Sequence, residues 1–456
     1  MSSLAWVARS FGSYSPLTNT ETIERDVCII GGGSSGTYSA IRLQQMGKSV
    51  VLIEREDRLG GHVNTYVDPL THKTFDYGVV IFGNSSIVTD YFGYFNIPLT
   101  PWGGTGASDA VFADFANAAV VSGQSLGQGN LTAALLAYED QLARYPYLEN
   151  GFGLPTPVPS DLLLSWAGFM EKYDLGAMAY TLFVFNQGAG NILAETALYI
   201  LKYFSATTVQ AFFTGSFLTT AHSDNQELYN AALAKLGTSA LLSSNVTRII
   251  RHRDHAEVVV STPTGIKCIE ASKLLIAIPP KLSNLGFMDL DDEERGIFSQ
   301  FNNSYYWAAV LKDSGIPYNT SLANVDPSAP YAIPQMPGVY GFGTVPGFSG
   351  LHTVYYGSPY PQSDAEVRAN ILDTTARLVE SLGYGTVNGT MAELVGFSAH
   401  NPYELTVSTD AIEDGFYGKL ESLQGSKRTW WTGAAFQTED SSAIWKFTEQ
   451  RVLPSL

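Results

Sequence analysis

The pattern of apolar and polar positions near the N-terminus predicts a compact β-α-β unit. A short apolar run over 26–30 is followed by the glycine-rich stretch 31–36, and apolar residues then recur at helical spacing as far as Met46. Gly47 lies where a helix normally ends, and a second apolar run, 50–53, follows soon after. Two strands joined by one helix are therefore expected here.

The middle of the chain predicts further strands. A Ser223-x-x-Gln226 capping box indicates the start of a helix, and Gly237 is expected to end it. Short apolar runs then alternate with turn residues until two prolines, which predicts a β-meander and one fully buried strand. These runs are 246–250, 257–260, 267–269 and 274–278, and a short strand at 430–431 with a closing helix ends the chain.

Two long segments interrupt these elements. They are rich in aromatic side chains, and short helices or irregular structure are expected in them in place of β-α units. We therefore predict an α/β fold with two domains, each discontinuous in sequence. The nucleotide-type domain comprises 25–95, 223–285 and 390–456, the second domain comprises 96–222 and 286–389, and a polar arm, 1–24, precedes both.

Composition excludes several classes of protein. The chain has 456 residues and a net charge of −17, and its 26 basic residues are spread along it, which argues against a nucleic-acid partner. No apolar run is long enough for a transmembrane helix. Cys28 and Cys268 are the only cysteines, so neither a disulfide framework nor a cysteine metal site is expected. The aromatic content of 12% allows an aromatic-lined pocket.

The cellular location and the oligomeric state stay open. No signal peptide is visible, which fits a soluble cytoplasmic protein. Asn-x-Ser/Thr sequons give weak support for secretion, and they begin at Asn84, Asn130, Asn245, Asn302, Asn319 and Asn388.

The glycine-rich stretch indicates a dinucleotide site. Gly31-x-Gly33-x-x-Gly36 follows a strand and opens a helix, where the glycines permit a tight turn, a close approach to a pyrophosphate and close helix packing. The helix N-terminus favours phosphate, and Glu54 at the end of the next strand is suited to accept ribose hydroxyls. The predicted contacts are Gly31, Gly33, Ser34, Ser35, Gly36, Glu54 and Arg55.

The block from Glu54 to Thr65 resembles the Arg-x-Gly-Gly-x-x-x-Thr signature of the flavin amine oxidase superfamily, and 429–435 resembles its C-terminal flavin strand. The resemblance implies FAD and a Rossmann-type FAD-binding domain of the glutathione-reductase-like, amine oxidase type, with a discontinuous α+β substrate domain. In the superfamily that strand usually ends Gly-Asp or Gly-x-Glu, and Ala434 and Ala435 depart from this pattern, so no carboxylate is expected there. The implied FAD contacts are Gly60, Gly61, His62 (a cation only at low pH), Val246, Gly433, Ala434, Ala443 and Ile444.

Further stretches are similar to the fungal β-cyclopiazonate dehydrogenase-like group, with bacterial polyenoic fatty acid isomerase as a more distant relative. They are 26–38, 60–62, 400–403, 415–417 and 423–425.

One departure from the amine oxidases bears on the substrate. Their usual lysine near the flavin is replaced by Trp307, unless a slip of the alignment restores Lys312 to that place. A flat, apolar pocket is therefore expected, with Trp307, Tyr306 and Trp430 as its walls. His400 and Tyr403 are expected at the flavin face, with a structural turn before Pro402 as the alternative.

The resemblance implies an oxidoreductase that removes a hydride from a hydrophobic small molecule, with O₂ as a candidate for reoxidising the flavin. The product would be a desaturated or oxidatively cyclised secondary metabolite. FAD is expected to be held noncovalently, and a histidyl link stays open. The alternatives are a redox-neutral isomerase of polyunsaturated fatty acids and a non-catalytic binder similar to Rab GDP-dissociation inhibitors.

Overall fold

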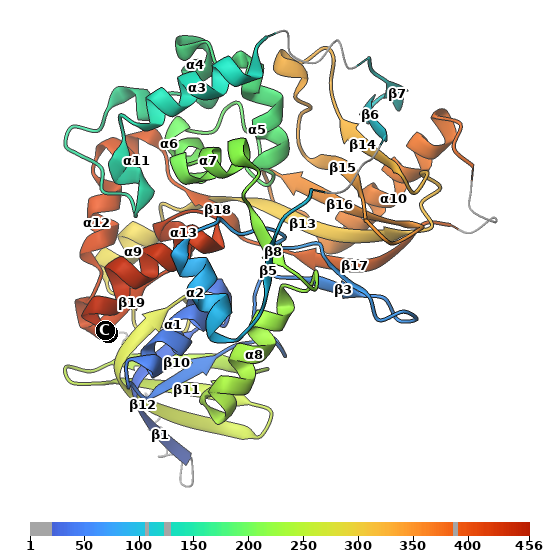
Figure 1. Ribbon diagram of the computed structural model, residues 1–456. Coiled ribbons are helices and arrows are strands. Elements are labelled where there is room, and N and C mark those ends of the chain that lie inside the picture. The colour runs from blue at the N-terminus through green and yellow to red at the C-terminus, as the bar shows by residue number, and fades with distance from the viewer. Residues whose placement is uncertain (1–20, 105–108, 123–128, 386–390) are drawn as a thin grey trace, which may run out of the picture.

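The computed structural model describes residues 21–104, 109–122, 129–385 and 391–456, which are organised around two large sheets (Figure 1). The first sheet has the order β10-β11-β12-β1-β2-β9, with β19 paired to β12. Its strands are β1 (Glu21–Ile30), β2 (Val50–Ile53), β9 (Ala240–Leu241), β10 (Asn245–Arg251), β11 (Ala256–Thr262), β12 (Gly265–Ile276) and β19 (Thr429–Trp431).

The predicted β-α-β unit is confirmed. Strands β1 and β2 pair in parallel, and helix α1 (Ser34–Gln45) connects them and ends before Gly47, whose φ is +80°. Strand β1 begins at Glu21, so the last residues of the predicted arm extend the sheet by pairing with β12, while 1–20 lie outside the described residues. The two predicted strands at 267–269 and 274–278 are one continuous strand, β12.

The second sheet has the order β17-β13-β16-β15-β14-β6-β7, with β18 paired to β13. The expectation of irregular structure over 286–389 is therefore wrong, because four of these strands lie there. Strands β17 and β18 also belong to this sheet, although the predicted boundary at 390 assigns them to the first domain. The strands are β6 (Asp109–Asp114), β7 (Ala119–Val120), β13 (Asn302–Lys312), β14 (Thr320–Asn324), β15 (Gly338–Thr344), β16 (Leu351–Ser358), β17 (Glu393–Ala399) and β18 (Tyr403–Thr406).

Helices α3 to α7 gather beside the second sheet (green in Figure 1), and α10 packs against that sheet. They are α3 (Leu131–Leu142), α4 (Trp166–Tyr173), α5 (Ala179–Phe185), α6 (Ala197–Tyr203), α7 (Ala206–Thr214) and α10 (Asp364–Ser381). The others are α2 (Ser86–Tyr94), α8 (Gln226–Leu236), α9 (Asp292–Phe298), α11 (Thr409–Glu413), α12 (Phe416–Ser422) and α13 (Ser441–Phe447). Strands β3 (Thr65–Val67) and β4 (Thr74–Asp76) form a short hairpin, and β5 (Leu99–Pro101) pairs antiparallel with β8 (Leu218–Thr220) from a distant part of the chain.

The predicted capping box before α8 is wrong. Ser223 lies outside the helix with a φ of +55°, and Asn225 takes the N-cap position. The Gln226 side chain instead donates to the carbonyl oxygen of Leu59, which ties the helix to the glycine loop. Gly237 ends the helix as predicted. None of the described helices combines the length and the apolar character that crossing a bilayer requires.

Candidate active site

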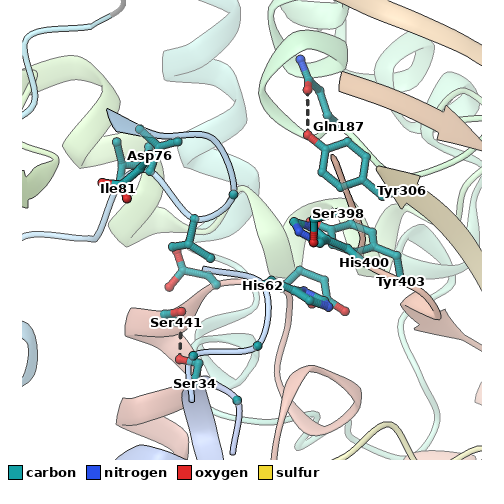
Figure 2. Close-up of a pocket in the computed structure, with 18 of the residues that line it drawn as sticks. Ser34, His62, Asp76, Ile81, Gln187, Tyr306, Ser398, His400, Tyr403 and Ser441 are labelled. Carbon is teal, nitrogen blue, oxygen red and sulfur yellow. Dashed lines mark hydrogen bonds between the residues drawn. The ribbon is translucent and has the colours of Figure 1, made fainter. Parts of the chain in front are cut away.

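A cavity of about 1870 Å³ lies where the carboxyl ends of β1 and β2 face the second sheet. Ile30 and Ile53, the last residues of these strands, line it at one end, and Tyr306 and Tyr355 of the second sheet line it at the other. Figure 2 shows Ser34 and Ser441 at the first end and Tyr306 and Gln187 at the second. Parallel α/β sheets bind their ligands at this edge, beyond the strand ends.

The glycine loop forms the first end of the cavity. A Cβ atom on Gly36 would collide with the carbonyl oxygen of Gly31, so only glycine allows α1 to start this close to β1. A Cβ atom on Gly61 would lie 3.1 Å from the Cα atom of Gly33, so the second loop passes directly beside the first. Gly31, Gly33, Ser34, Ser35, Gly60 and Gly61 line the cavity, and Gly36 supports it from behind.

Glu54 stands beside this loop, as predicted for a residue that binds ribose. Its Oε2 atom accepts from the backbone N–H of Gly32 at 2.6 Å, and its Oε1 atom accepts from the N–H of Glu56 at 2.8 Å. These two bonds fix the carboxylate in place with lone pairs still free. Arg55 and Val246 line the same end of the cavity. The structure thus brings the residues that were predicted to contact a dinucleotide together at one end of the cavity.

Arg58 organises the loop that follows. Its guanidinium donates to the carbonyl oxygens of Val63 and Gly61 and to Oδ1 of Asn64, the last at 3.0 Å. Because Oδ1 accepts from arginine, the amide nitrogen of Asn64 must face the other way. That nitrogen donates to His400 Nε2 at 2.9 Å. An amide nitrogen can only donate, so His400 is a neutral imidazole with its proton on Nδ1.

His62 and His400 form a stacked pair that the spacing of the chain did not predict. Their ring centroids lie 4.3 Å apart and the planes differ by 9°. Burial, with the charges of Arg58 and Arg55 as a second cause, lowers the pKa of His62 to about 4. The pKa of His400 lies well below its ordinary value, mainly through burial. Both rings are therefore neutral at physiological pH, and His62 becomes a cation only near pH 4.

Aromatic side chains form the second end of the cavity. The Tyr306 ring lies 6.0 Å from that of Tyr355 and 5.1 Å from that of Tyr403, centroid to centroid. The Tyr306 hydroxyl donates to Oε1 of Gln187 at 3.0 Å (Figure 2). Sequence analysis named Tyr306 and Tyr403 but missed Gln187 and Tyr355, because no local motif marks them.

Trp307 is not a wall of the cavity, contrary to prediction. Side chains alternate between the two faces of a strand, so a cavity-facing Tyr306 directs its neighbour to the other face. Trp307 is fully buried there, and its Nε1 donates to Oδ1 of Asp364 at 2.9 Å. Lys312 is exposed at the end of β13 and does not line the cavity, so no shift of the alignment brings it to the site.

Trp430 is also misplaced by the sequence prediction. It sits on β19, pairs with Leu275 of β12 and lies outside the cavity lining. Its Nε1 donates to Ser455 Oγ at 2.8 Å, and the Lys273 ammonium lies 4.9 Å from the ring centroid. Its surroundings are those of a core residue near the C-terminus.

The loop before α13 reaches both ends of the cavity, because Ser441 bonds to Ser34 at the first end and Glu439 accepts from the N–H of Glu404, next to Tyr403, at the second. Gly433, Ala434 and Ile444 line the cavity as predicted, and Ser34 and Ser441 are hydrogen bonded through their hydroxyls at 2.9 Å. Ala443, which was also predicted, does not line the cavity. Its backbone N–H donates to Oδ1 of Asp440, the N-cap residue of α13, at 2.7 Å. The alanines at 434 and 435 carry no carboxyl group. Two acidic residues further along the loop, Glu439 and Asp440, do line the cavity.

Charge is distributed unevenly along the cavity. Among the described residues, the lining contributed by 180–217, 306–355 and 397–405 contains no Asp, Glu, Lys or Arg. The charged lining residues belong to the glycine-loop end, the β4 hairpin and the loop before α13. They are Glu54, Arg55, Glu56, Arg58, Asp76, Glu439 and Asp440.

The residues at the first end of the cavity fit the adenosine and diphosphate parts of FAD. Gly33 and Gly61 lie side by side and have no side chains, so their backbone is exposed to the cavity next to the start of α1. Such a surface suits a pyrophosphate. Glu54 is positioned for a ribose, and the remaining volume extends to the histidine pair, where an isoalloxazine ring has room.

Comparisons with known proteins agree with this geometry. Residues 29–95 match a family model described as an NAD(P)-binding Rossmann-like domain. The chain is 38% identical over 445 residues to FAD-dependent oxidoreductase oblC of Cochliobolus heterostrophus, covering 96% of this chain and 92% of that protein. It is 32% identical over 464 residues to the β-cyclopiazonate dehydrogenase of Aspergillus oryzae, covering 99% and 96%.

Solved structures show the same fold. A fatty acid isomerase from P. acnes that produces CLA aligns with a TM-score of 0.74 at 20% identity, over 94% of this chain and 98% of that chain. A putrescine oxidase variant aligns with a TM-score of 0.67 at 16% identity, over 95% and 99%. At such low identity these likenesses establish the fold, whereas the full-length relatives establish the family. The chain belongs to the family of FAD-dependent oxidoreductases that includes fungal β-cyclopiazonate dehydrogenase.

Proposed function

We propose that the protein oxidises a neutral, hydrophobic small molecule by hydride abstraction, with noncovalent FAD in the cavity as the hydride acceptor. The observation that carries this proposal is the aromatic end of the cavity, whose described lining has no charged side chain. A charged substrate would lose its hydration there without gaining a partner, whereas a flat apolar molecule buries its surface against the tyrosines.

The chain's own residues would bind and orient the substrate. Tyr306, Tyr355 and Tyr403 provide flat surfaces that exclude water. Gln187 holds the Tyr306 hydroxyl, which fixes that ring against the cavity. FAD, when bound, supplies the two-electron acceptor, and the protein supplies orientation and a dry site.

We also propose that the product is a desaturated or oxidatively cyclised secondary metabolite and that O₂ restores the flavin. The fungal relatives support this class of reaction through the oxidoreductase and dehydrogenase names that they carry. The aromatic end supports it too, because among the described residues its lining offers a charged amine no carboxylate partner.

The alternative is a redox-neutral isomerase of polyunsaturated fatty acids. It is supported by the fold that this chain shares with a fatty acid isomerase. A fatty acid carries a carboxylate, and such groups are usually bound by Arg or Lys. The described lining at the aromatic end offers neither. A GDP-dissociation-inhibitor-like binder is disfavoured by the full-length similarity to oxidoreductases.

Anaerobic mixing of the purified protein with candidate compounds tests the proposal. Neutral aromatic polyketides and indole metabolites should bleach the flavin absorption, and readmitting O₂ should restore it with one H₂O₂ per turnover. Polyunsaturated fatty acids serve as the matched second set. Turnover of a fatty acid without H₂O₂ formation would establish the isomerase instead, and a colourless protein that takes up no FAD would exclude both enzymes.

The same preparation tests how FAD is held. Noncovalent binding is expected, because neither cysteine lines the cavity. Acid precipitation should release the yellow cofactor into the supernatant. A yellow precipitate would indicate a covalent histidyl link.

A further inference from the structure

A second cavity, of about 20 Å³, adjoins the main one beneath the loop before α13. Glu439 lines both cavities, so it connects them. Lys202, Glu404 and Gln437 also line the small cavity. This volume holds about one water molecule, and a site with several polar walls favours its binding.

Lys202 stands at one end of the small cavity. Its residue exposure is only 2%, and its ammonium donates to the carbonyl oxygens of Leu148 at 2.7 Å and Gly151 at 2.8 Å. The third bond goes to Oε1 of Gln437 at 2.9 Å. These three partners are neutral. The three bonds use all three hydrogens of the ammonium, and its charge is balanced from further away by Glu149 and Glu421.

Glu404 and Glu439 stand at the other end. The backbone N–H of Glu404 donates to Oε1 of Glu439 at 3.2 Å, which holds the two residues together. The Oε2 atom of Glu404 is buried and has no hydrogen-bond partner among the described residues. Because an unpaired buried carboxyl oxygen is costly, this atom requires a proton, a water molecule or both.

We propose that Glu439 is the proton acceptor of the active site, and that Glu404 and one water molecule in the small cavity lie behind it and hold and return the proton. Glu439 is the catalytic residue in this scheme, since it reaches the main cavity. Glu404 is a positioning residue that acts through it, and Lys202 fixes Gln437, another wall of the small cavity. The inference rests on the proposed oxidation.

The electrostatics support this assignment. Burial raises the pKa of Glu439 to about 7 and that of Glu404 well above its ordinary value, and burial lowers the pKa of Lys202 to about 7. A group whose pKa lies near the working pH can both take and give a proton. The other titratable groups facing the pair are Glu195, Tyr199, Tyr203, Tyr403, Tyr417 and Asp440, each with a raised pKa and so predominantly neutral or less acidic than usual.

The step balances as a two-electron oxidation. The substrate loses two hydrogens, of which one leaves as a hydride to the bound FAD and carries both electrons. The other leaves as a proton, and the Glu439 carboxylate accepts it to become a carboxylic acid. When O₂ is reduced to H₂O₂ by the two electrons, the stored proton is one of the two that the peroxide requires.

Infrared titration of the holoenzyme without substrate tests the site itself. The wild type should lose the carboxylic-acid C=O bands of Glu439 and Asp76 as the pH rises through about 7, because both pKa values lie there, and E439Q should lose only the band of Asp76. E270Q is the matched control, because Glu270 is exposed on β12, and it should keep both bands. E439D should retain a titrating group if E439Q folds poorly.

An equal loss of carboxylic-acid absorption in E439Q and the wild type overturns the assignment of Glu439. Photoreduction of the bound flavin in weak buffer with a pH indicator provides the second readout. At a pH above about 7, where the Glu439 carboxylate is ionised, the negative charge of the reduced flavin favours its protonation, so the wild type and E270Q should take up more protons from solution per flavin than E439Q. Equal uptake contradicts the proposal. A protein that binds no flavin refutes the proposed oxidation, yet the infrared titration still decides whether Glu439 holds the proton.

Discussion

Asn64 determines the protonation of the residues around it. Its amide oxygen accepts from Arg58, and its amide nitrogen donates to Nε2 of His400. The charged Arg58 thus fixes the orientation of the amide, and the amide fixes His400 in its neutral form. This arrangement is imposed by hydrogen-bonding capacity, because arginine cannot accept and an amide nitrogen cannot either. The histidine pair therefore offers a flat, uncharged surface to the cavity.

Glu54 is expected to be the residue whose loss most weakens retention of FAD. Replacing it in E54A removes the carboxylate aimed at the ribose, and the loss of two hydrogen bonds should reduce binding by about 1–3 kcal/mol. Dialysis followed by absorption spectroscopy measures the FAD retained. E56A is the control, because Glu56 is an adjacent, exposed acid whose carboxylate pairs with Arg55. Equal retention in the two variants would remove Glu54 from its role.

Strand β13 shows how one element separates the site from the core. Tyr306 and Trp307 are neighbours in sequence and have opposite surroundings, because the strand is paired on both sides and its two faces pack against different partners. One face meets the cavity and the other meets a cluster that includes Val367 and Ile371 of α10.

We therefore expect W307F and Y306F to differ in kind. W307F should lower the free energy of unfolding by about 1–3 kcal/mol, because a buried ring shrinks and Asp364 loses its donor. Y306F should change that free energy by less than about 1 kcal/mol and alter the rate of flavin bleaching by a substrate. Urea denaturation and stopped-flow absorbance measure the two effects. A larger loss of stability in Y306F would contradict the placement of the two faces.

The two glycine loops form another element whose geometry is testable. In G61A a Cβ atom is forced toward Gly33 at a backbone φ of +55°, so the loops should separate and FAD content should fall at least tenfold, for a cost of about 1.4 kcal/mol or more. G418A is the control, because Gly418 lies within α12 and a Cβ atom there meets open space. Bound FAD per protein, read from the absorption spectrum, should be normal in the control.

At the scale of the whole molecule, buried titratable groups of opposite kinds surround one cavity. Burial lowers the pKa of His62 to about 4 and raises the pKa of Asp76 to about 7. Thr65 and the backbone N–H of Asn225 donate to Asp76 and reduce this rise without abolishing it. Burying these groups costs free energy of folding, and the same burial excludes water from the cavity.

The opposite shifts predict two contributions to stability that oppose each other between about pH 4 and 6.5. His62 binds its proton more weakly in the folded state, so its contribution should fall as the pH decreases from about 6.5 toward 4. Asp76 binds its proton more tightly in the folded state, so its contribution should fall as the pH rises from about 4 toward 7. H62Q should leave a stability that falls as the pH rises, and D76N one that falls as the pH decreases, each by about 3–4 kcal/mol at most. Urea unfolding of the holoenzyme across this range measures both, and variants with the pH profile of the wild type would contradict the shifts.

The amino-acid sequence by itself determined the dinucleotide-binding end of the protein. The glycine loop, the acid after the second strand and the helix stop at Gly47 are local features, because each depends on backbone conformation within a few residues. The second sheet was missed for the same reason. Its strands pair across long separations, as β14 does with β6, and their aromatic residues give no clear period.

Only the tertiary structure decided which side chains meet in the cavity. Gln187 and Tyr306, His62 and His400, and Glu404 and Glu439 come together through strand register and packing between the two sheets. A shift of one residue in β13 would exchange Tyr306 for Trp307, since successive side chains face opposite sides of a strand. Local spacing determines the conformation of a loop, whereas the direction and the burial of a side chain depend on partners far away in the sequence.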